Sequence, residues 1–390
     1  MCAWERGGKR RVLTRRHALC LGVLLLWTLL CAGCGAGESA APDAAAEVVG
    51  SMELRYARCF SVDYLAGGCA QVSIEGGDRF LIVPEGAQEP RELSPDACVL
   101  HTPLKNCYLA DSSAMDLFLQ LDALDRVRFT STRAEDWSID AVRDALAEDA
   151  ILYAGKYSAP DYEALIEEDC GFALENTMIY HSPKTKEQLE ALGIPVLVER
   201  SSYEDHPLGR MEWARLYGLL TGKEAEADAL FDRACERVED ILSAERGERS
   251  VAVFYLSSGG YVNVRRPGDY VSRMVELAGG RYALGLADSG EDRRSTMNMQ
   301  TEAFYDQARS ADVLIYNAVV DGGVADLSSL LERAGWLKDF QAVKNGEVWC
   351  MEQDMYQRTS AVAEVIEDLH TLLTEGADAP EQLTYLHRLR

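Results

Sequence analysis

The sequence predicts an α/β protein of two lobes, each with a mostly parallel sheet flanked by helices, joined by a long interdomain helix. Short apolar segments alternate with amphipathic ones twice along the chain, through residues 107–198 and 251–373, a pattern typical of covered parallel sheets. Between these stretches, residues 223–246 contain neither glycine nor proline. With 390 residues, 47% of them hydrophobic, the chain is long enough for two domains.

The first 33 residues are expected to be a lipoprotein signal peptide. Several basic residues precede an apolar run at residues 18–30, which is shorter than the roughly 20 residues that cross a bilayer. A basic segment followed by a short apolar one is typical of a secretion signal. Cys31-Ala32-Gly33-Cys34 resembles a lipobox, so we expect lipidation of Cys34, although Cys31 stands where leucine is usual. An uncleaved signal anchor remains the alternative, and residues 14–19 also resemble a twin-arginine signal.

The remaining chain divides by composition and periodicity. Residues 34–50 are mostly small and polar, and we expect them to form a flexible tether. The N-terminal lobe is expected at residues 51–206 and the C-terminal lobe at 247–390, with connecting helices at 207–246 that include the interlobe rod at 223–246. The protein is therefore expected outside the cytoplasm, lipid-anchored to the cell membrane, at the cell surface or in the periplasm.

The chain is strongly acidic, with 39 Lys and Arg against 64 Asp and Glu and a formal charge of −25. This charge excludes nucleic acid as a partner, because binding a phosphate backbone needs clustered lysine and arginine. The six histidines are scattered without metal-binding spacing. We therefore expect no metal site built by the protein and no resident cofactor.

The cysteines do not form the pattern of a disulfide scaffold. Beyond Cys34 there are seven, an odd number without a CxxC pair. Several lie in apolar runs, which favours buried free thiols. Pairing of Cys59 with Cys69 or of Cys98 with Cys107 remains open.

The first lobe is expected to begin with a β-rich segment at residues 53–101. There, strands at 72–74 and 80–83 flank a glycine-containing turn, which predicts a hairpin. Short apolar runs then predict strands, and amphipathic stretches between them predict helices. The strands are expected at 107–110, 127–129, 151–154, 172–174 and 195–198, and the helices at 114–121, 139–147, 161–167 and 185–192.

The connecting region is expected to form two helices. Residues 207–220 begin with proline, which favours a helix start, and Gly222 interrupts the pattern. Within residues 223–246, apolar positions recur every three or four residues, as on one face of a helix. At 1.5 Å per residue this helix spans about 36 Å, enough to bridge two lobes.

The second lobe repeats the alternation. Its strands are expected at 251–256, 313–316 and 347–351, and its helices at 269–278, 301–310, 327–332 and 359–373. Loops after the carboxyl ends of parallel strands commonly line a binding cleft. Neither a GxSxG elbow nor a phosphate-binding loop occurs, so we expect no catalysis. Residues 257–260 could hold an anion through backbone N–H groups, but a plain turn is the simpler interpretation.

Five short motifs occur in a recognisable order and spacing. They are Asp111–Ala114 leading to Leu124–Val127, Gly155–Glu163 preceding Phe172–Leu174, Leu189–Val196, Tyr217–Ala227, and Ala278–Gly280. Together, over residues 95–375, they resemble the substrate-binding proteins of ABC importers for iron–siderophore complexes, haem and cobalamin, the helix-linked bilobed class. The resemblance implies ABC transporter permease subunits as partners and a metal chelate as ligand.

The resemblance also implies two docking carboxylates, one at the tip of each lobe, which would pair with arginines of the permease. Glu163 occupies the position in the first lobe, and Asp269 is the nearest match in the second. A carboxylate in the first turn of a helix is stabilised by the helix dipole and stays available for charge pairing. The alternative is that both residues only favour their own helix starts.

Candidate ligand-binding residues lie at the loops expected to face the cleft. In the first lobe they are Ser112, Ser113, Lys156, Tyr157, Asn176, Thr177, Met178 and Arg200. In the second lobe they are Ser257, Tyr261, Arg265, Asn317 and Tyr356. This mixture of aromatic faces, hydroxyls and cations suits a large, flat or anionic chelate. Arg210 could reach the cleft or pair with a nearby acid, and the pairing is favoured.

The sequence thus predicts a monomeric receptor that delivers a metal chelate to a permease, with a ferric siderophore as first choice and cobalamin or haem next. One alternative is an exported α/β hydrolase or oxidoreductase, with Ser257 as nucleophile and His181 or His206 as base. Another is a surface adhesion or scaffold protein, which would expose a large apolar patch.

Overall fold

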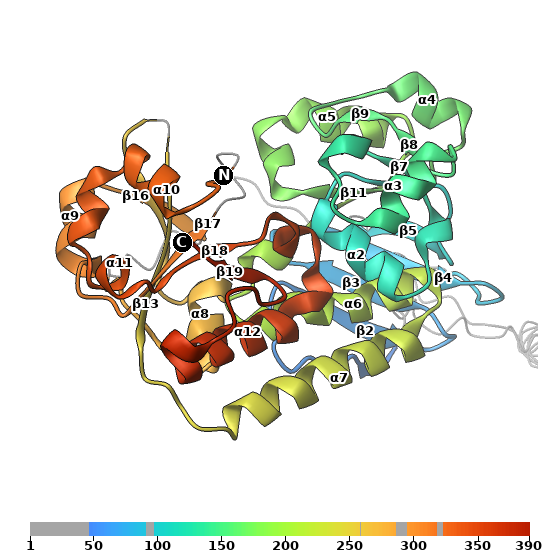
Figure 1. The fold of residues 1–390 in the computed structure, drawn as a ribbon. Coiled ribbons are helices and arrows are strands. Elements are labelled where there is room, and N and C mark those ends of the chain that lie inside the picture. The colour runs from blue at the N-terminus through green and yellow to red at the C-terminus, as the bar shows by residue number, and fades with distance from the viewer. Residues whose placement is uncertain (1–46, 91–96, 258, 286–294, 318–322) are drawn as a thin grey trace, which may run out of the picture. The chain divides into compact units, whose positions relative to one another are not determined.

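The computed structural model describes residues 47–90, 97–257, 259–285, 295–317 and 323–390. The expected signal peptide, Cys34 and most of the expected tether lie outside the described residues. Residues 46–390 belong to one compact unit. Its described part contains two five-stranded sheets, one seven-stranded sheet and a two-stranded ribbon, with helices packed around them (Figure 1).

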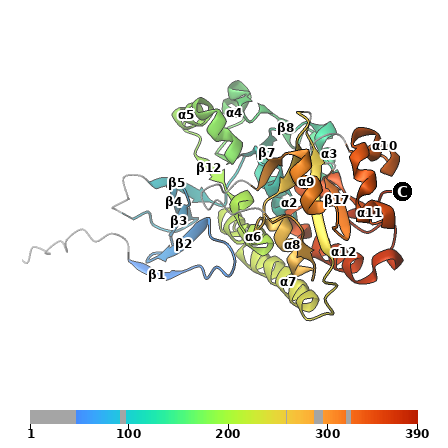
Figure 2. The same ribbon diagram turned by 90° about the vertical axis from the view of Figure 1, so that its left-hand side faces the viewer.

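The N-terminal sheet is a separate layer that precedes the first lobe (Figure 2). Its strands lie side by side in sequence order, and they are β1 (Val48–Ser51), β2 (Phe60–Leu65), β3 (Ala70–Ile74), β4 (Arg79–Pro84) and β5 (Ala97–Thr102). β3 and β4 form the predicted hairpin, and β5 joins β4 in parallel. β1 pairs with β2, so residues 48–50 belong to this sheet rather than to the tether.

The first α/β layer is a sheet of five parallel strands in the order β12-β11-β6-β7-β8. The strands are β6 (Cys107–Leu109), β7 (Val127–Thr130), β8 (Leu152–Tyr153), β11 (Phe172–Asn176) and β12 (Val196–Glu199). Helices α2 (Ser112–Gln120), α3 (Asp140–Ala147), α4 (Tyr162–Glu167) and α5 (Pro183–Ala191) flank them, and β9 (Gly155–Lys156) and β10 (Ala159–Pro160) form the ribbon. The expected strands and helices of this region are confirmed.

Two connecting helices follow, α6 (Pro207–Thr221) and α7 (Glu224–Leu242). Gly222 ends α6 in the left-handed conformation, with φ of 73°, which glycine adopts without steric cost. The buried face of α7, which includes Phe231 and Val238, packs against α6, α8 and α12 (Figure 1). The rod is therefore part of a shared hydrophobic core, and its helix ends four residues before the expected boundary.

The second α/β layer has a parallel centre and antiparallel edges. β13 (Ser250–Leu256), β17 (Val313–Asn317) and β18 (Val348–Met351) run in parallel, while β14 (Val262–Arg265), β16 (Thr296–Met299) and β19 (Leu386–Arg388) are antiparallel additions. The short strand β15 (Arg281–Tyr282) pairs with the start of β13. The flanking helices are α8 (Tyr270–Leu277), α9 (Thr301–Ala308), α10 (Leu327–Arg333), α11 (Gln341–Asn345) and α12 (Val362–Glu375).

Two buried carboxylates, one in α6 and one just before it, hold the segment that leads into β2. Glu212 accepts hydrogen bonds from the backbone N–H groups of Arg55, Tyr56 and Ala57, at 2.8–2.9 Å. Glu204 accepts those of Arg58 and Cys59, at 2.8 and 2.9 Å. Five consecutive N–H groups of a segment outside any strand are thus satisfied by two side chains.

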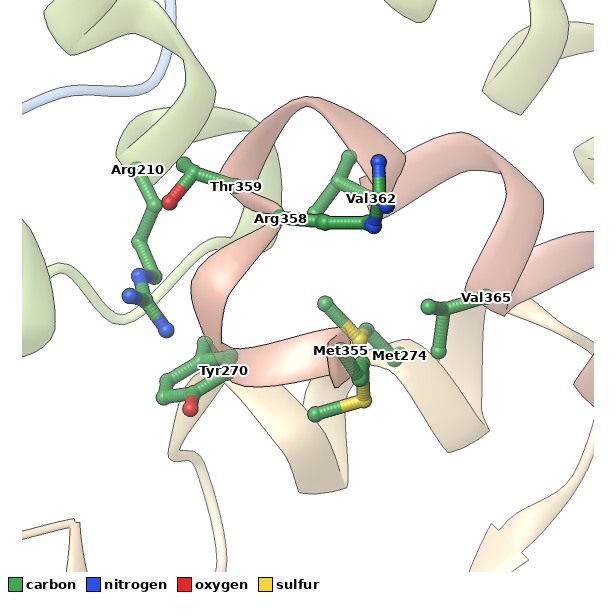
Figure 3. Close-up of a pocket in the computed structure, with 8 residues that line it drawn as sticks. All are labelled: Arg210, Tyr270, Met274, Met355, Arg358, Thr359, Val362 and Val365. Atoms are coloured by element: carbon green, nitrogen blue, oxygen red, sulfur yellow. The ribbon is translucent and has the colours of Figure 1, made fainter. Parts of the chain in front are cut away.

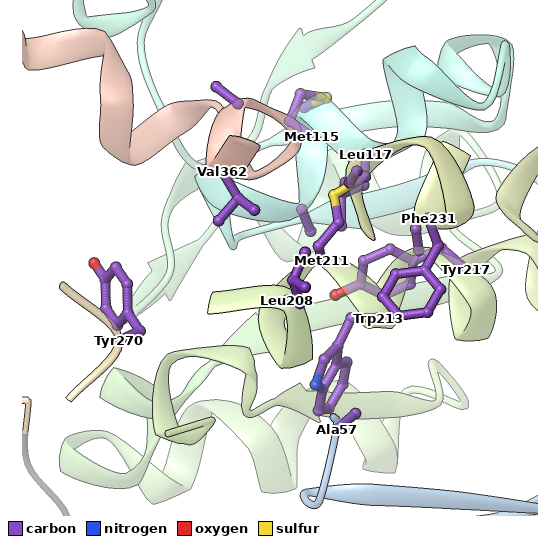
Figure 4. Close-up of a cluster of buried hydrophobic side chains, with 14 of the residues drawn as sticks. Ala57, Met115, Leu117, Leu208, Met211, Trp213, Tyr217, Phe231, Tyr270 and Val362 are labelled. Atoms are coloured by element: carbon purple, nitrogen blue, oxygen red, sulfur yellow. The ribbon is translucent and has the colours of Figure 1, made fainter. Parts of the chain in front are cut away.

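An aromatic cluster fills the space beneath this attachment (Figure 4). The Trp213 ring lies 4.9 Å from Phe60 and 6.3 Å from Tyr217, between ring centroids. Its Nε1 donates to Glu204 at 3.0 Å. Because Phe60 belongs to β2 while Trp213 and Tyr217 belong to α6, the cluster joins the N-terminal sheet to the connecting helices.

Within the described ranges, no helix is both long enough and apolar enough to span a membrane. The same ranges contain no disulfide bond. Six of their seven cysteines are buried, and the seventh, Cys98, is half-buried.

Candidate functional site

The carboxyl ends of β6 and β11 place several predicted residues together. Asp111 caps α2 and accepts hydrogen bonds from Ser113, from its backbone nitrogen at 2.7 Å and from its hydroxyl at 2.6 Å. Asn176 donates from Nδ2 to the carbonyl of Ala110 and accepts from the nitrogen of Met178. Ser113 and Asn176 therefore shape this edge of the sheet through capping hydrogen bonds.

The other first-lobe candidates differ in exposure. Ser112, Tyr157 and Thr177 are half-buried, whereas Lys156 and Met178 are exposed. Half of the surface of Met178 is accessible. Lys156 and Met178 are thus free to meet a ligand from solvent.

Arg200 lies against the N-terminal sheet. Its guanidinium carbon is 5.7 Å from the ring centre of Tyr180 and 5.5 Å from that of Tyr203. Its Nη1 is 3.7 Å from a carboxylate oxygen of Glu75, in the turn between β3 and β4. The structure therefore gives Arg200 an ion pair with this turn, a partner that the sequence analysis did not foresee.

Ser257 and Tyr261 form the turn between β13 and β14. The Ser257 hydroxyl donates to the Tyr261 carbonyl at 2.9 Å and accepts from the Tyr261 nitrogen at 3.1 Å. These hydrogen bonds close a turn, in agreement with the simpler of the two interpretations of this segment. Both residues line a pocket of about 350 Å³ together with Trp336, Thr301 and Arg333. Two aromatic side chains and a cation around a volume of this size are features of small-molecule sites.

Three other second-lobe candidates meet in a polar cluster. Arg265 is buried, its Nε donates to Asp269 at 2.6 Å, and its guanidinium carbon lies 4.7 Å from the ring centre of Tyr270. Asn317 donates from Nδ2 to the hydroxyl of Tyr356 at 2.8 Å. Burial raises the pKa of Tyr356 above its usual range, so this phenol stays protonated.

The prediction that Asp269 is an exposed docking carboxylate is wrong. Its surface is only 9% exposed, because the side chain turns inward to Arg265 and accepts from the nitrogen of Ser272 as the cap of α8. Burial raises the pKa of this carboxyl, against the opposing effect of Arg265. Glu163, in contrast, is exposed in the first turn of α4.

A small, partly open cavity of about 20 Å³ lies where α6, α8 and the start of α12 meet (Figure 3). Its polar wall consists of Arg210, Arg358 and Thr359, and its apolar wall includes Met274 and Met355. We name it the Arg210 cavity. Nearby, Thr359 donates its hydroxyl to the carbonyl of Ser113 at 2.9 Å, so the cavity adjoins a contact between the first and second α/β layers.

Among the residues that the structure describes, no acid forms an ion pair with Arg210. Arg210 is 9% exposed, its Nε is buried without a hydrogen-bond partner, and its guanidinium carbon lies 4.1 Å from the ring centre of Tyr270. The arginine was not among the predicted ligand residues. The sequence contained an indication that Arg210 is unusual. A cation near the start of a helix interacts unfavourably with the helix dipole.

Two buried carboxyls at the same sheet edge were also missed. Glu175 is the second-last residue of β11 and Glu199 is the last residue of β12, and both are almost fully buried. Burial, reinforced by the nearby charge of Asp111, raises the pKa of each to about 8. Both oxygens of Glu175 are without a hydrogen-bond partner. The described residues contain no group of three side chains placed to hold a metal ion.

Comparison with known proteins finds a relative that is similar in sequence and many solved structures that are similar in fold. No protein-family model matches the chain. An uncharacterised lipoprotein of Methanocaldococcus jannaschii, MJ0878, is 26% identical over 317 residues, which cover 76% of this chain and 72% of that protein.

Solved structures of periplasmic binding proteins share the fold. The haem-binding protein HutB of Vibrio cholerae matches with a TM-score of 0.55 and 16% identity, over 69% of this chain and 99% of HutB. The petrobactin-binding protein YclQ of Bacillus subtilis matches with a TM-score of 0.57 and 14% identity, over 78% of this chain and 98% of YclQ. At these identities the similarity establishes the two-lobed α/β fold.

Proposed function

We propose that the chain is an extracytoplasmic receptor, lipid-anchored through Cys34, that binds a metal chelate and delivers it to an ABC permease. The observation that carries the proposal is the fold, which matches nearly the whole length of binding proteins for haem and petrobactin. The lipobox-like sequence before Cys34 and the lipoprotein relative support the anchor.

The ligand we propose first is a ferric siderophore, with haem or cobalamin next. In the second lobe, the pocket lined by Tyr261 and Trp336 offers aromatic surface. In the first lobe, Met178 and Lys156 offer exposed thioether and cationic groups. Aromatic faces and cations together favour flat or anionic ligands. A chelate brings its own metal ligands, so the protein does not need to supply a coordination set.

Titration with a panel of ferric siderophores, haemin and cobalamin tests this assignment through quenching of tryptophan fluorescence. We expect one class to bind with a dissociation constant in the micromolar range or below, where binding is worth about 8 kcal/mol or more. Replacing Tyr261 by alanine is expected to weaken that binding about tenfold, because a contact face is lost. Leu242→Ala, at an exposed position on α7, is the matched control. Binding no tighter than millimolar across the panel would remove the chelate assignment.

Glu163 is proposed to dock onto the permease. Glu163→Arg reverses an exposed charge at the start of α4, so we expect chelate uptake by cells to fall at least tenfold while chelate binding by the purified protein is unchanged. Glu167→Arg, which makes the same change at another exposed position of α4, is the control. Equal uptake by the two variants would contradict a specific role for Glu163.

The alternative of a hydrolase finds no assembled nucleophile and base at the expected residues. The Ser257 hydroxyl is bonded within its own turn. His206 caps α6 through Nδ1, stacks on Tyr56 with ring centres 4.4 Å apart, and has its pKa lowered to about 4 by burial. For the adhesion alternative, the exposed apolar side chains described are distributed over several separate elements rather than one.

A further inference from the structure

The environment of Arg210 is unfavourable for a cation as the structure stands. Arg210 is 9% exposed as a whole residue, and a buried charge normally has an ionic or hydrogen-bonded partner. Among the described residues no carboxylate forms an ion pair with Arg210, its Nε is buried without a hydrogen-bond partner, and its guanidinium lies over the face of Tyr270. Its place near the start of α6 adds the positive end of a helix dipole.

The charged groups around Arg210 do not neutralise it. Asp269 is already paired with Arg265, whose guanidinium contacts the same Tyr270 ring. Glu199 is within electrostatic range but makes no ion pair with Arg210, and burial holds its pKa near 8, so this carboxyl is largely protonated at neutral pH. Arg358, the second cation of the cavity wall, is paired with Asp354 at 3.2 Å. One positive charge therefore remains uncompensated.

The space beside Arg210 is suited to a small acceptor group. A cavity of about 20 Å³ exceeds the roughly 10–15 Å³ that hold one water-sized group. Figure 3 shows Arg210 and Arg358 on the wall of this cavity, opposite the methionines. Carboxylates and other oxyanions are the groups that guanidinium binds best, through paired N–H donors.

We propose that the Arg210 cavity is an anion subsite that takes a carboxylate group. The carboxylate belongs either to the chelate in the proposed binding site or to a small free acid. The first source rests on the proposed function, whereas the second does not. The cavity adjoins the contact between Thr359 and Ser113, so its occupant lies at the junction of the two α/β layers.

Titration with citrate tests the subsite without any chelate. In calorimetry at constant ionic strength, we expect Arg210→Met to weaken citrate binding at least tenfold, while Arg210→Lys keeps part of the affinity. Arg309→Met removes the same charge from an exposed site at the end of α9 and is expected to bind like the unmodified protein. Thermal unfolding without citrate verifies that each variant is folded. Unchanged citrate binding by Arg210→Met, or none by the unmodified protein, would overturn the subsite.

Haemin and its dimethyl ester, which lacks free carboxylates, distinguish the two sources. If the chelate supplies the carboxylate, the unmodified protein prefers haemin to the ester, and Arg210→Met loses this preference. If haemin and ester bind equally while citrate needs Arg210, the occupant is a free acid. If neither porphyrin binds, haem is removed from the proposed ligands, and the citrate result still decides the subsite.

Discussion

Replacing Glu212 by alanine is expected to lower the free energy of unfolding by about 3–5 kcal/mol, the range for removing one partner of a buried charged network. Glu212 is fully buried and accepts three backbone N–H groups from residues 55–57. Hydrogen bonds to a charged group are worth about 1.5–3 kcal/mol each, and donors left unsatisfied cost more. The extended segment before β2 would lose its main attachment to α6.

Denaturant unfolding monitored by fluorescence measures this loss, because Trp213 lies in the aromatic cluster beneath the attachment. Glu212→Gln retains one acceptor oxygen and is expected to lose less stability than Glu212→Ala. Glu236→Ala, at an exposed position of α7, is expected to change the free energy of unfolding by no more than about 0.5 kcal/mol. Equal stability of the two alanine variants would show that the carboxylate does not hold the sheet.

The second large effect is a pH dependence of stability that arises from Glu175 and Glu199. Burial raises the pKa of each carboxyl from 4.5 to about 8 in the folded protein, so between these pH values the folded state binds more protons than the unfolded state. Stability from this source is therefore present at low pH and falls as pH rises towards 8. Each carboxyl contributes a slope of up to about 1.4 kcal/mol per pH unit.

Glu175→Gln is expected to remove one of these contributions. Measured by denaturant unfolding at pH 6, 7 and 8, the variant gains stability relative to the unmodified protein as pH rises. His206 acts in the opposite direction up to about pH 6.5, because burial lowers its pKa to about 4, but both proteins contain it and its contribution cancels from their difference. Glu163→Gln, an exposed control, is expected to leave the pH profile unchanged, and a parallel profile for Glu175→Gln would contradict the buried proton.

Much of the fold is predictable because it depends on periodicity that the sequence displays. Buried parallel strands such as β6 and β12 are continuous apolar runs, and α7 has a clear apolar stripe. The missed strands lie mostly at sheet edges. β14, β16 and β19 are short, and their pairing depends on neighbours brought from elsewhere in the chain, which local propensity does not encode.

The site was less predictable, because the direction of a loop side chain depends on tertiary packing. Asp269 matched an expected position in sequence but turns inward to Arg265. Arg210 was expected to pair with an acid, and Glu175 and Glu199 were passed over, because charged residues at the ends of helices and strands are usually exposed. The sequence feature that these residues share is a charged side chain directly beside an apolar run. In this protein such residues are buried together with the run.

The position of the metal tests the central claim most directly. Crystals of the protein soaked with the chelate that binds most tightly would be measured at the absorption edge of its metal. We expect one anomalous peak near the carboxyl ends of β6 and β11, within reach of Tyr261 or the Arg210 cavity. The account would be contradicted by a peak in the groove beside β5, which Val99, His101 and Lys105 help to line. It would also be contradicted by the absence of any ordered metal.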